Sequence, residues 1–126
     1  MVADEAEVGR NTAERPGVDR VSQLLKGVLD MCLLAVVSER PSYGYEMIRT
    51  LADRGLALGS EGTIYPVLSR LQRNGLLEGY LVESAEGPAR KYYRVTDEGR
   101  TTLARWVDDW HGLVSGVEQV LRGGDR

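Results

Sequence analysis

Apolar residues recur at helical spacing in the first third of the chain. From Ser22 to Val37 they return every three or four positions, and the run from Met31 to Val37 is apolar on every side. This pattern predicts one helix of about 16 residues, which ends before Pro41. A helix that is apolar all round must be covered on more than one face. In so short a chain, we expect a second subunit to supply part of that cover.

Two shorter amphipathic helices follow. Ser42 stands at the predicted N-cap of the first, and Gly55 at its end. The second follows Ser60, has Pro66 near its first turn and ends at Gly75. Their apolar stripes are Met47, Ile48, Leu51 and Ala52 in one helix, and Ile64, Val67, Leu68 and Leu71 in the other.

The next segment alternates in the manner of β-strands. Residues 77–83 and 90–95 read as two strands of a hairpin, separated by the turn-forming cluster 84–89. Thr96 then caps a last helix of roughly 25 residues, which is about 38 Å long. Asp97 and Glu98 lie in its first turn, where the helix dipole favours acidic residues.

This last helix has the most regular pattern in the chain. Its apolar residues alternate between spacings of three and four, as in a heptad seam, and three more widen the seam at intervals of seven. So long a stripe exceeds what the small preceding domain can cover, so we expect a partner helix. The predicted dimer interface consists of Leu24, Val28, Leu103, Trp106, Trp110, Leu113, Val114, Val117, Val120 and Leu121.

The order of elements, three helices, a hairpin and a further helix, is that of a winged helix-turn-helix. The predicted fold class is mainly α with a small β-hairpin, extended by a long C-terminal dimerisation helix. We divide the chain into a flexible N-terminal arm (1–20), a winged helix-turn-helix DNA-binding domain (21–96) and the dimerisation helix (97–122).

Composition removes several classes of protein. The 126 residues are 42% hydrophobic, which is enough for one domain with a single core. No apolar stretch is long enough to span a membrane and the polar start is not a signal peptide, so we expect a cytoplasmic protein. A lone cysteine, Cys32, cannot form an intrachain disulfide, and one cysteine with one histidine, His111, cannot assemble a Cys/His zinc site. No catalytic constellation stands out, so we expect no enzyme, metal or cofactor.

The net charge of −3 at first argues against a nucleic-acid partner, because phosphate contacts come from Lys and Arg. By segment, however, the charge is −2 for residues 1–20, 0 for 21–59, +1 for 60–105 and −2 for 106–126. The excess of acidic residues therefore lies in the arm and the last helix, and not in the third helix and the hairpin, which are the elements expected to contact DNA.

Those two elements carry suitable chemistry. The outward face of the third helix offers hydroxyl and guanidinium groups, which contact phosphates and, for arginine, read guanine. The second strand adds a basic cluster, and the helix starts offer backbone N–H groups to phosphates. We predict a double-stranded DNA partner, contacted by Ser42, Tyr43, Ser60, Gly62, Thr63, Tyr65, Ser69, Arg70, Arg73, Arg90, Lys91, Tyr92 and Arg94.

Five segments together resemble the PadR family of bacterial transcriptional regulators. They are residues 25–30 (LKGVLD), 42–46 (SYGYE), 62–71 (GTIYPVLSRL), 75–77 (GLL) and 90–99 (RKYYRVTDEG), within a resemblance that covers about residues 23–121. It implies a homodimeric repressor that binds an inverted-repeat operator and leaves it when a small effector binds or the dimer geometry changes. The single C-terminal helix is similar to that of the short subfamily, some of whose members hold a planar aromatic molecule beside a tryptophan at the position of Trp110; Trp106 adds a second indole.

Several residues have a second interpretation. The two tryptophans at heptad positions pack more often in an interface than around a ligand, and Cys32 reads as an inert buried thiol. We assign Tyr45 and Tyr93 to the core, and Tyr43, Tyr65 and Tyr92 to the DNA side. The alternative function is a winged-helix protein-protein interaction module without DNA binding, which would gain little from the hydroxyl and arginine side chains of the third helix.

Overall fold

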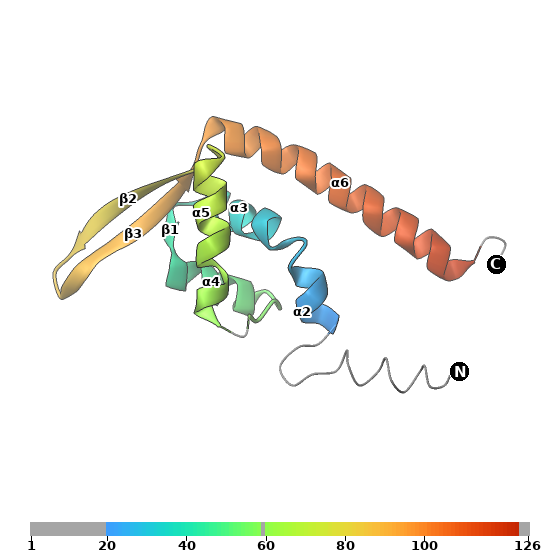
Figure 1. The fold of residues 1–126 in the computed structure, drawn as a ribbon, viewed down its shortest axis with the longest axis horizontal. Helices are drawn as coiled ribbons and strands as arrows, with labels where there is room; N and C mark the ends of the chain where they lie inside the picture. The colour runs from blue at the N-terminus through green and yellow to red at the C-terminus, as the bar shows by residue number, and fades with distance from the viewer. Residues whose placement is uncertain (1–19, 59, 124–126) are drawn as a thin grey trace.

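The structure, a computed structural model, describes residues 20–58 and 60–123, so the predicted N-terminal arm lies almost wholly outside the described residues. The predicted order of helices and hairpin is confirmed except that the first helix is divided in two, and a short strand and a 3₁₀ helix are added (Figure 1). The elements are α2 (Arg20–Leu25), α3 (Leu29–Glu39), β1 (Ser42–Tyr43), α4 (Gly44–Asp53), the 3₁₀ helix η1 (Glu61–Thr63), α5 (Tyr65–Arg73), β2 (Leu77–Ser84), β3 (Gly87–Val95) and α6 (Asp97–Arg122).

The single first helix that we predicted is wrong, because a tight turn divides it into α2 and α3. The backbone N–H of Gly27 donates to the carbonyl of Leu24, and that of Val28 to the carbonyl of Leu25, at 3.1 and 3.0 Å. These bonds span three residues instead of the four of an α-helix. Glycine weakens a helix interior, and the apolar spacing continues across the turn, so periodicity alone conceals the break.

The predicted hairpin is longer and its turn shorter than expected. Ser84 pairs with Gly87, so the connection is a two-residue turn in place of the six-residue cluster. β3 also pairs with β1, where Ser42 lies opposite Tyr93 and Tyr43 opposite Tyr92. The result is a three-stranded antiparallel sheet in the order β1-β3-β2.

One hydrophobic core lies where α3, α4 and α5 meet the base of the sheet. Its residues come from every predicted apolar stripe of the domain, and the beginning of α6 adds Leu103 and Trp106 at its edge. The prediction that Tyr93 is buried is confirmed. The buried apolar residues are Leu29, Leu33, Leu34, Val36, Val37, Met47, Leu51, Ile64, Leu68, Leu71, Leu76, Leu77 and Tyr93.

The start of α6 is joined firmly to the end of α5. The predicted N-cap is confirmed, since the Thr96 hydroxyl oxygen accepts a hydrogen bond from the N–H of Gly99 at 2.9 Å. The same hydroxyl donates to the carbonyl of Gly75 at 2.7 Å, and the Thr96 N–H donates to the carbonyl of Leu76 at 3.1 Å. Gly99 is buried directly against that Leu76 carbonyl, and a β carbon at this position would collide with it.

From this joint, α6 continues well beyond the core. The hairpin and the distal part of α6 project from opposite sides of the helical body (Figure 1). Apolar side chains of the distal part are exposed, including Leu113 at 61% and Leu121 at 74%. No helix among residues 20–58 and 60–123 is both long and apolar enough to cross a membrane.

Candidate nucleic-acid interface

The outward face of α5 and the turn before it form the first part of the candidate interface. Ser60 precedes η1, and its hydroxyl oxygen accepts a hydrogen bond from the N–H of Gly62 at 3.1 Å. The predicted placement of Pro66 in the first turn of the helix is confirmed. Leu68 and Leu71 anchor the inner side of α5 in the core, so the opposite side faces solvent. The exposed residues predicted to contact DNA are Ser60, Gly62, Thr63, Tyr65, Ser69, Arg70 and Arg73.

Tyr65 is held by two neighbours, although 42% of it is exposed. Its hydroxyl donates to the Glu61 carboxylate at 2.7 Å, and this hydrogen bond is the main reason that the pKa of Tyr65 rises to about 12. Its ring lies against Gly44, where a β carbon would come within 2.6 Å of the hydroxyl oxygen. The Tyr65 ring therefore fixes the start of α5 on the start of α4, and its hydroxyl already has an acceptor.

At the start of α4, two predictions require correction. Ser42 is not the N-cap: it belongs to β1, is buried, and its hydroxyl donates to the carbonyl of Arg40 at 3.1 Å. Tyr43 is the N-cap residue, because the sheet extends to it and α4 begins one residue later. The prediction that Tyr45 belongs to the core is also wrong, since half of it is exposed and the Arg49 guanidinium lies 5.7 Å from its ring centroid.

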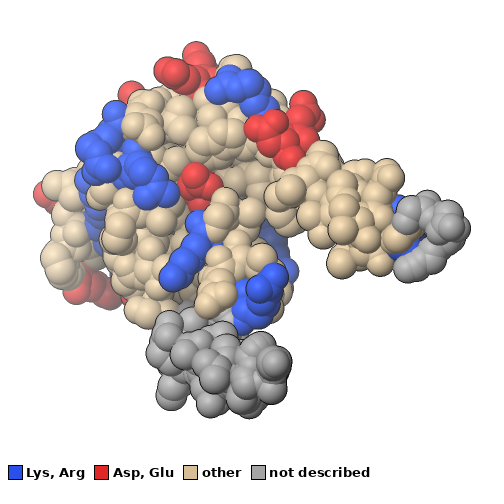
Figure 2. Space-filling view, turned by 45° about the vertical axis from the view of Figure 1, so that its right-hand side comes forward, with Lys and Arg blue, Asp and Glu red and all other residues tan. Residues whose placement is uncertain are grey.

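The hairpin divides its basic residues between two faces. Successive side chains of a strand point to opposite sides, so Arg90, Tyr92 and Arg94 share one face of β3. Lys91 shares the other face with the buried Tyr93, and its Nζ lies 5.5 Å from the Tyr93 ring centroid. Three of these residues, Arg90, Lys91 and Arg94, are exposed. Lys and Arg side chains form separate clusters over the body of the molecule, while the side of distal α6 in view has few charges (Figure 2).

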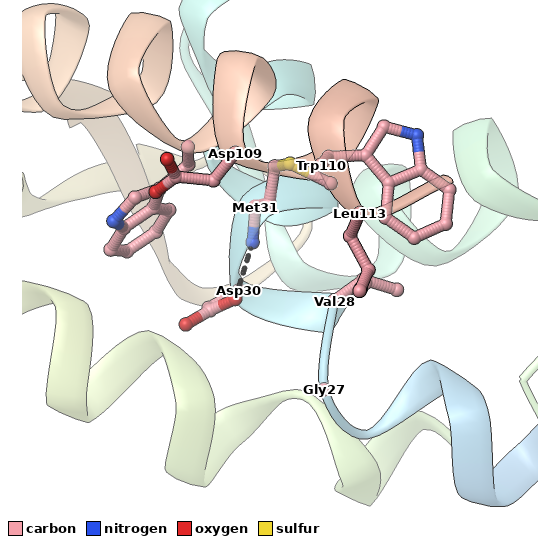
Figure 3. Close-up of a pocket in the computed structure, with 8 residues that line it drawn as sticks. Gly27, Val28, Asp30, Met31, Asp109, Trp110 and Leu113 are labelled. Carbon is pink, nitrogen blue, oxygen red and sulfur yellow. Dashed lines mark hydrogen bonds between the residues drawn. The ribbon is translucent and has the colours of Figure 1, made fainter. Parts of the chain in front are cut away.

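A hollow between α6 and the start of α3 contains the residues predicted for an effector. It is an open cleft of about 340 Å³, lined by Gly27, Val28, Asp30, Met31, Trp106, Asp109, Trp110 and Leu113. Val28 and Met31 face Trp110 and Leu113 across it (Figure 3). The Asp30 carboxylate accepts a hydrogen bond from the N–H of Met31 at 2.7 Å. The cleft thus combines apolar and indole walls with two carboxylates and no basic residue.

The predicted dimer residues extend from this cleft along α6. Leu103 and Trp106 lie half-buried against the core, whereas Leu24, Leu113, Val117, Val120 and Leu121 are exposed. Val28 and Val114 are half-buried. Cys32 is also half-buried, and burial raises the pKa of its thiol, which makes the reactive thiolate scarce. Within the described residues, no group of three or more His, Cys, Asp and Glu side chains is placed to hold a metal ion.

Sequence reasoning missed three residues that shape this surface. Glu61 engages the Tyr65 hydroxyl, and Arg49 lies over Tyr45. Tyr80 lies opposite Tyr92 on the sheet. The two-residue turn alone would place Tyr80 opposite Lys91, and a bulge between Val82 and Ser84 shifts the register by one residue, so sequence alternation gives no signal for this pairing.

Comparison with known proteins decides the family of this fold. The transcriptional regulator PadR-like family matches residues 33–105, which is more than half of the chain. The chain belongs to this family. The PadR-like regulator BC4206 from Bacillus cereus is 42% identical, with a TM-score of 0.70 over 80% of this chain and 98% of that one.

Two further relatives agree with that membership. A PadR family regulator from Eggerthella lenta is 34% identical, with a TM-score of 0.74, and the match covers 96% of this chain and 97% of that one. Transcriptional regulator Rv3488 of Mycobacterium tuberculosis is 32% identical over 91 residues, which are 72% of this chain and 80% of that protein. This PadR-like chain is therefore a winged-helix, DNA-binding transcriptional regulator and not an enzyme.

Proposed function

We propose that this PadR-like chain is a homodimeric repressor, which binds an inverted-repeat operator in duplex DNA in the cytoplasm and is released by a small molecule. The exposed face of α5 carries this proposal. A core-anchored helix that presents Ser69, Arg70 and Arg73 to solvent is suited to enter the major groove, where arginine reads guanine. A protein-protein interaction module would have no need of these side chains.

The roles of the other residues follow from their positions. Ser60, Gly62 and Thr63 lie at the turn before α5 and are suited to phosphate contacts. Arg90 and Lys91 add basic side chains on the two faces of the hairpin, whose strand β2 packs against α5. For Ser42 we propose an indirect part, because its buried hydroxyl supports the β1 backbone that carries Tyr43.

Dimerisation is proposed from the uncovered apolar seam of α6. Exposed Leu113, Val117 and Val120 follow one another at the heptad spacings of four and three, and a second copy of α6 is the complementary surface for such a seam. Residues 21–96 then form the DNA-binding domain and 97–122 the dimerisation helix. A two-fold dimer matches a two-fold operator whose half-sites lie about one helical turn apart, or a multiple of that distance.

The effector is proposed to occupy the cleft beside Trp106 and Trp110. Indole walls favour a planar aromatic molecule, and Asp30 and Asp109 favour one that carries a positive charge. We expect such molecules to quench tryptophan fluorescence and to release DNA, and neutral analogues to act more weakly. Quenching without release would show that occupation of the cleft is not the switch.

The experiment that tests DNA reading is selection of bound genomic fragments, followed by gel-shift titrations on variants of the selected site. Arg70→Ala and Arg73→Ala are each expected to weaken binding by about 1–3 kcal/mol and to relax preference at one position. Lys91→Ala is expected to weaken binding to all sequences uniformly. Unchanged affinity in all three variants, with the fold intact by circular dichroism, would overturn the proposal.

A further inference from the structure

The face of the sheet turned away from the core carries a continuous row of aromatic and charged side chains. Leu77 and Tyr93 are buried on the opposite face, so this row lies on the outer one. It crosses all three strands. In spatial order the row consists of Arg90, Tyr43, Tyr92, Tyr80, Arg94 and Glu78.

Each member of the row contacts the next. The ring centroids of Tyr43 and Tyr92 are 5.2 Å apart, and those of Tyr92 and Tyr80 are 6.0 Å apart. An arginine lies against the outermost ring on each side. The Arg94 guanidinium lies 4.5 Å from the Tyr80 ring centroid, and that of Arg90 lies 4.7 Å from the Tyr43 ring centroid.

The two arginines differ in their charge partners. Arg94 Nε donates to the Glu78 carboxylate at 2.9 Å, so a negative charge compensates its own. Arg90 Nη1 donates to the neutral hydroxyl of Tyr43 at 3.1 Å, and no salt bridge from Arg90 occurs within the described residues. Arg90 is therefore oriented without being neutralised, whereas Arg94 is both oriented and neutralised.

Tyr43 is itself fixed from two directions. Its backbone pairs with Tyr92 in the sheet, and its N–H donates to the Glu46 carboxylate of α4 at 3.2 Å. A long arginine side chain loses conformational freedom when it binds a phosphate. A rigid ring and hydroxyl that hold the guanidinium in advance reduce this entropic cost.

We propose that Arg90 contacts a DNA phosphate from the outer face of the sheet and that Tyr43 is its positioning residue. Arg94 has a structural role in the row, because Glu78 neutralises its charge and so prevents it from contributing to DNA binding. This inference rests on the proposed DNA-binding function. The sequence-based prediction made Tyr43, Tyr92 and Arg94 direct DNA contacts. In this proposal Arg90 is the direct contact, and the other residues of the row support it.

The test measures binding to a mixed-sequence duplex by fluorescence anisotropy between about 50 and 200 mM salt, where the slope of log affinity against log salt counts the neutralised phosphates. Arg90→Gln is expected to reduce the slope by about 0.9 for each Arg90 that meets a phosphate, and the matched Arg94→Gln to leave it unchanged. An equal loss of slope in both variants would overturn the distinction.

The positioning role is tested by combining substitutions. Tyr43→Leu is expected to weaken binding about two- to fivefold in the native background and to have no effect in Arg90→Gln. Tyr43→Phe keeps the ring, and its DNA affinity is expected to lie between those of the unaltered protein and Tyr43→Leu. This variant provides a check in case Tyr43→Leu misfolds. An equal loss from Tyr43→Leu in both backgrounds would show that Tyr43 does not act through Arg90.

A third set of variants tests whether Glu78 neutralises the charge of Arg94. Glu78→Gln is expected to strengthen binding and steepen the slope by freeing Arg94, and to do neither in Arg94→Gln. Glu86→Gln removes the same charge from the hairpin turn and serves as control. Equal effects of Glu78→Gln and Glu86→Gln would overturn the role of Glu78. If the unaltered protein shows no salt-dependent binding, the proposed function itself fails, a result distinct from every variant outcome.

Discussion

The two halves of α6 share one hydrophobic spacing but lie in different surroundings. In the first half, Leu103 and Trp106 pack against the core and Thr102 is buried. In the second half, Leu113 and Val117 occupy equivalent heptad positions and are exposed. Heptad spacing thus indicates which side of a helix is apolar. The neighbouring elements determine whether that side is buried in the core or remains exposed and available to a partner.

Glycines mark the same division. Gly99, in the first turn, has no room for a β carbon because the Leu76 carbonyl lies against it. At Gly112 and Gly116, further along, a β carbon would meet no side chain and no other element within 4 Å among the described residues. The first glycine is required by packing within the subunit, and the other two are not.

The largest effect is expected from charge on the distal seam. The double variant Leu113→Glu with Val117→Glu should weaken the dimer at least about 100-fold, or roughly 3 kcal/mol, because two apolar side chains lose their cover. Light scattering measures the change in mass, and circular dichroism should show an intact fold. The control His111→Glu with Ser115→Glu places the same charges beside the seam, and equal dissociation in both variants would contradict a seam-specific interface.

Gly99→Ala comes next and tests the first half. The added methyl group has to displace the Leu76 backbone, so we expect a loss of about 1–3 kcal/mol in the free energy of unfolding. Denaturant titration measures it. Gly116→Ala is the matched control in open space, and a Gly99→Ala protein as stable as that control would contradict the tight joint.

Thr96→Val should have a smaller effect. It removes the N-cap acceptor of α6 and the hydrogen bond to Gly75 but keeps the shape of the side chain, so we expect a loss of about 1 kcal/mol. Thermal unfolding at fixed protein concentration checks this. Thr101→Val removes an exposed hydroxyl of the same helix, and a loss there as large as at Thr96 would show that the cap has no special role.

The smallest effect has the opposite sign. In the monomeric charge variant, Gly112→Ala should raise the free energy of unfolding by roughly 0.5–1 kcal/mol, because alanine favours an exposed helix over glycine. Denaturant midpoints measure this gain. A loss of stability in the monomer would mean that the distal half packs against its own subunit, which would remove the contrast between the two halves.

Sequence patterns predicted the features that are determined locally. The cap at Thr96, the glycines that end α4 and α5, and Pro66 in the first turn of α5 depend on neighbours within a few residues. Gly55 and Gly75 both have the positive φ that such ends favour. The amphipathic stripes likewise predicted which sides of α4 and α5 face the core, except that Ala52, assigned to the stripe of α4, is exposed because α4 ends one residue later.

Features that depend on distant partners were missed. β1 has only two residues, too few for alternation to appear, and exists because β3 lies beside it. The turn of the hairpin was read as six residues and the bulge between Val82 and Ser84 was not foreseen, so the pairing of Tyr80 with Tyr92 was missed. Tyr45 was assigned to the core, although its position on α4 directs it to solvent.

The joint at Thr96 makes α6 a lever. Its 26 residues span about 39 Å at 1.5 Å per residue, and its first turn is held by the end of α5. A tilt of about 10° at that joint displaces the far end by about 7 Å, roughly the length of two base-pair steps. In the proposed dimer, a small repacking of the two α6 helices would therefore change the distance between the two α5 helices without disturbing either core. This distance determines whether both α5 helices can fit one DNA molecule.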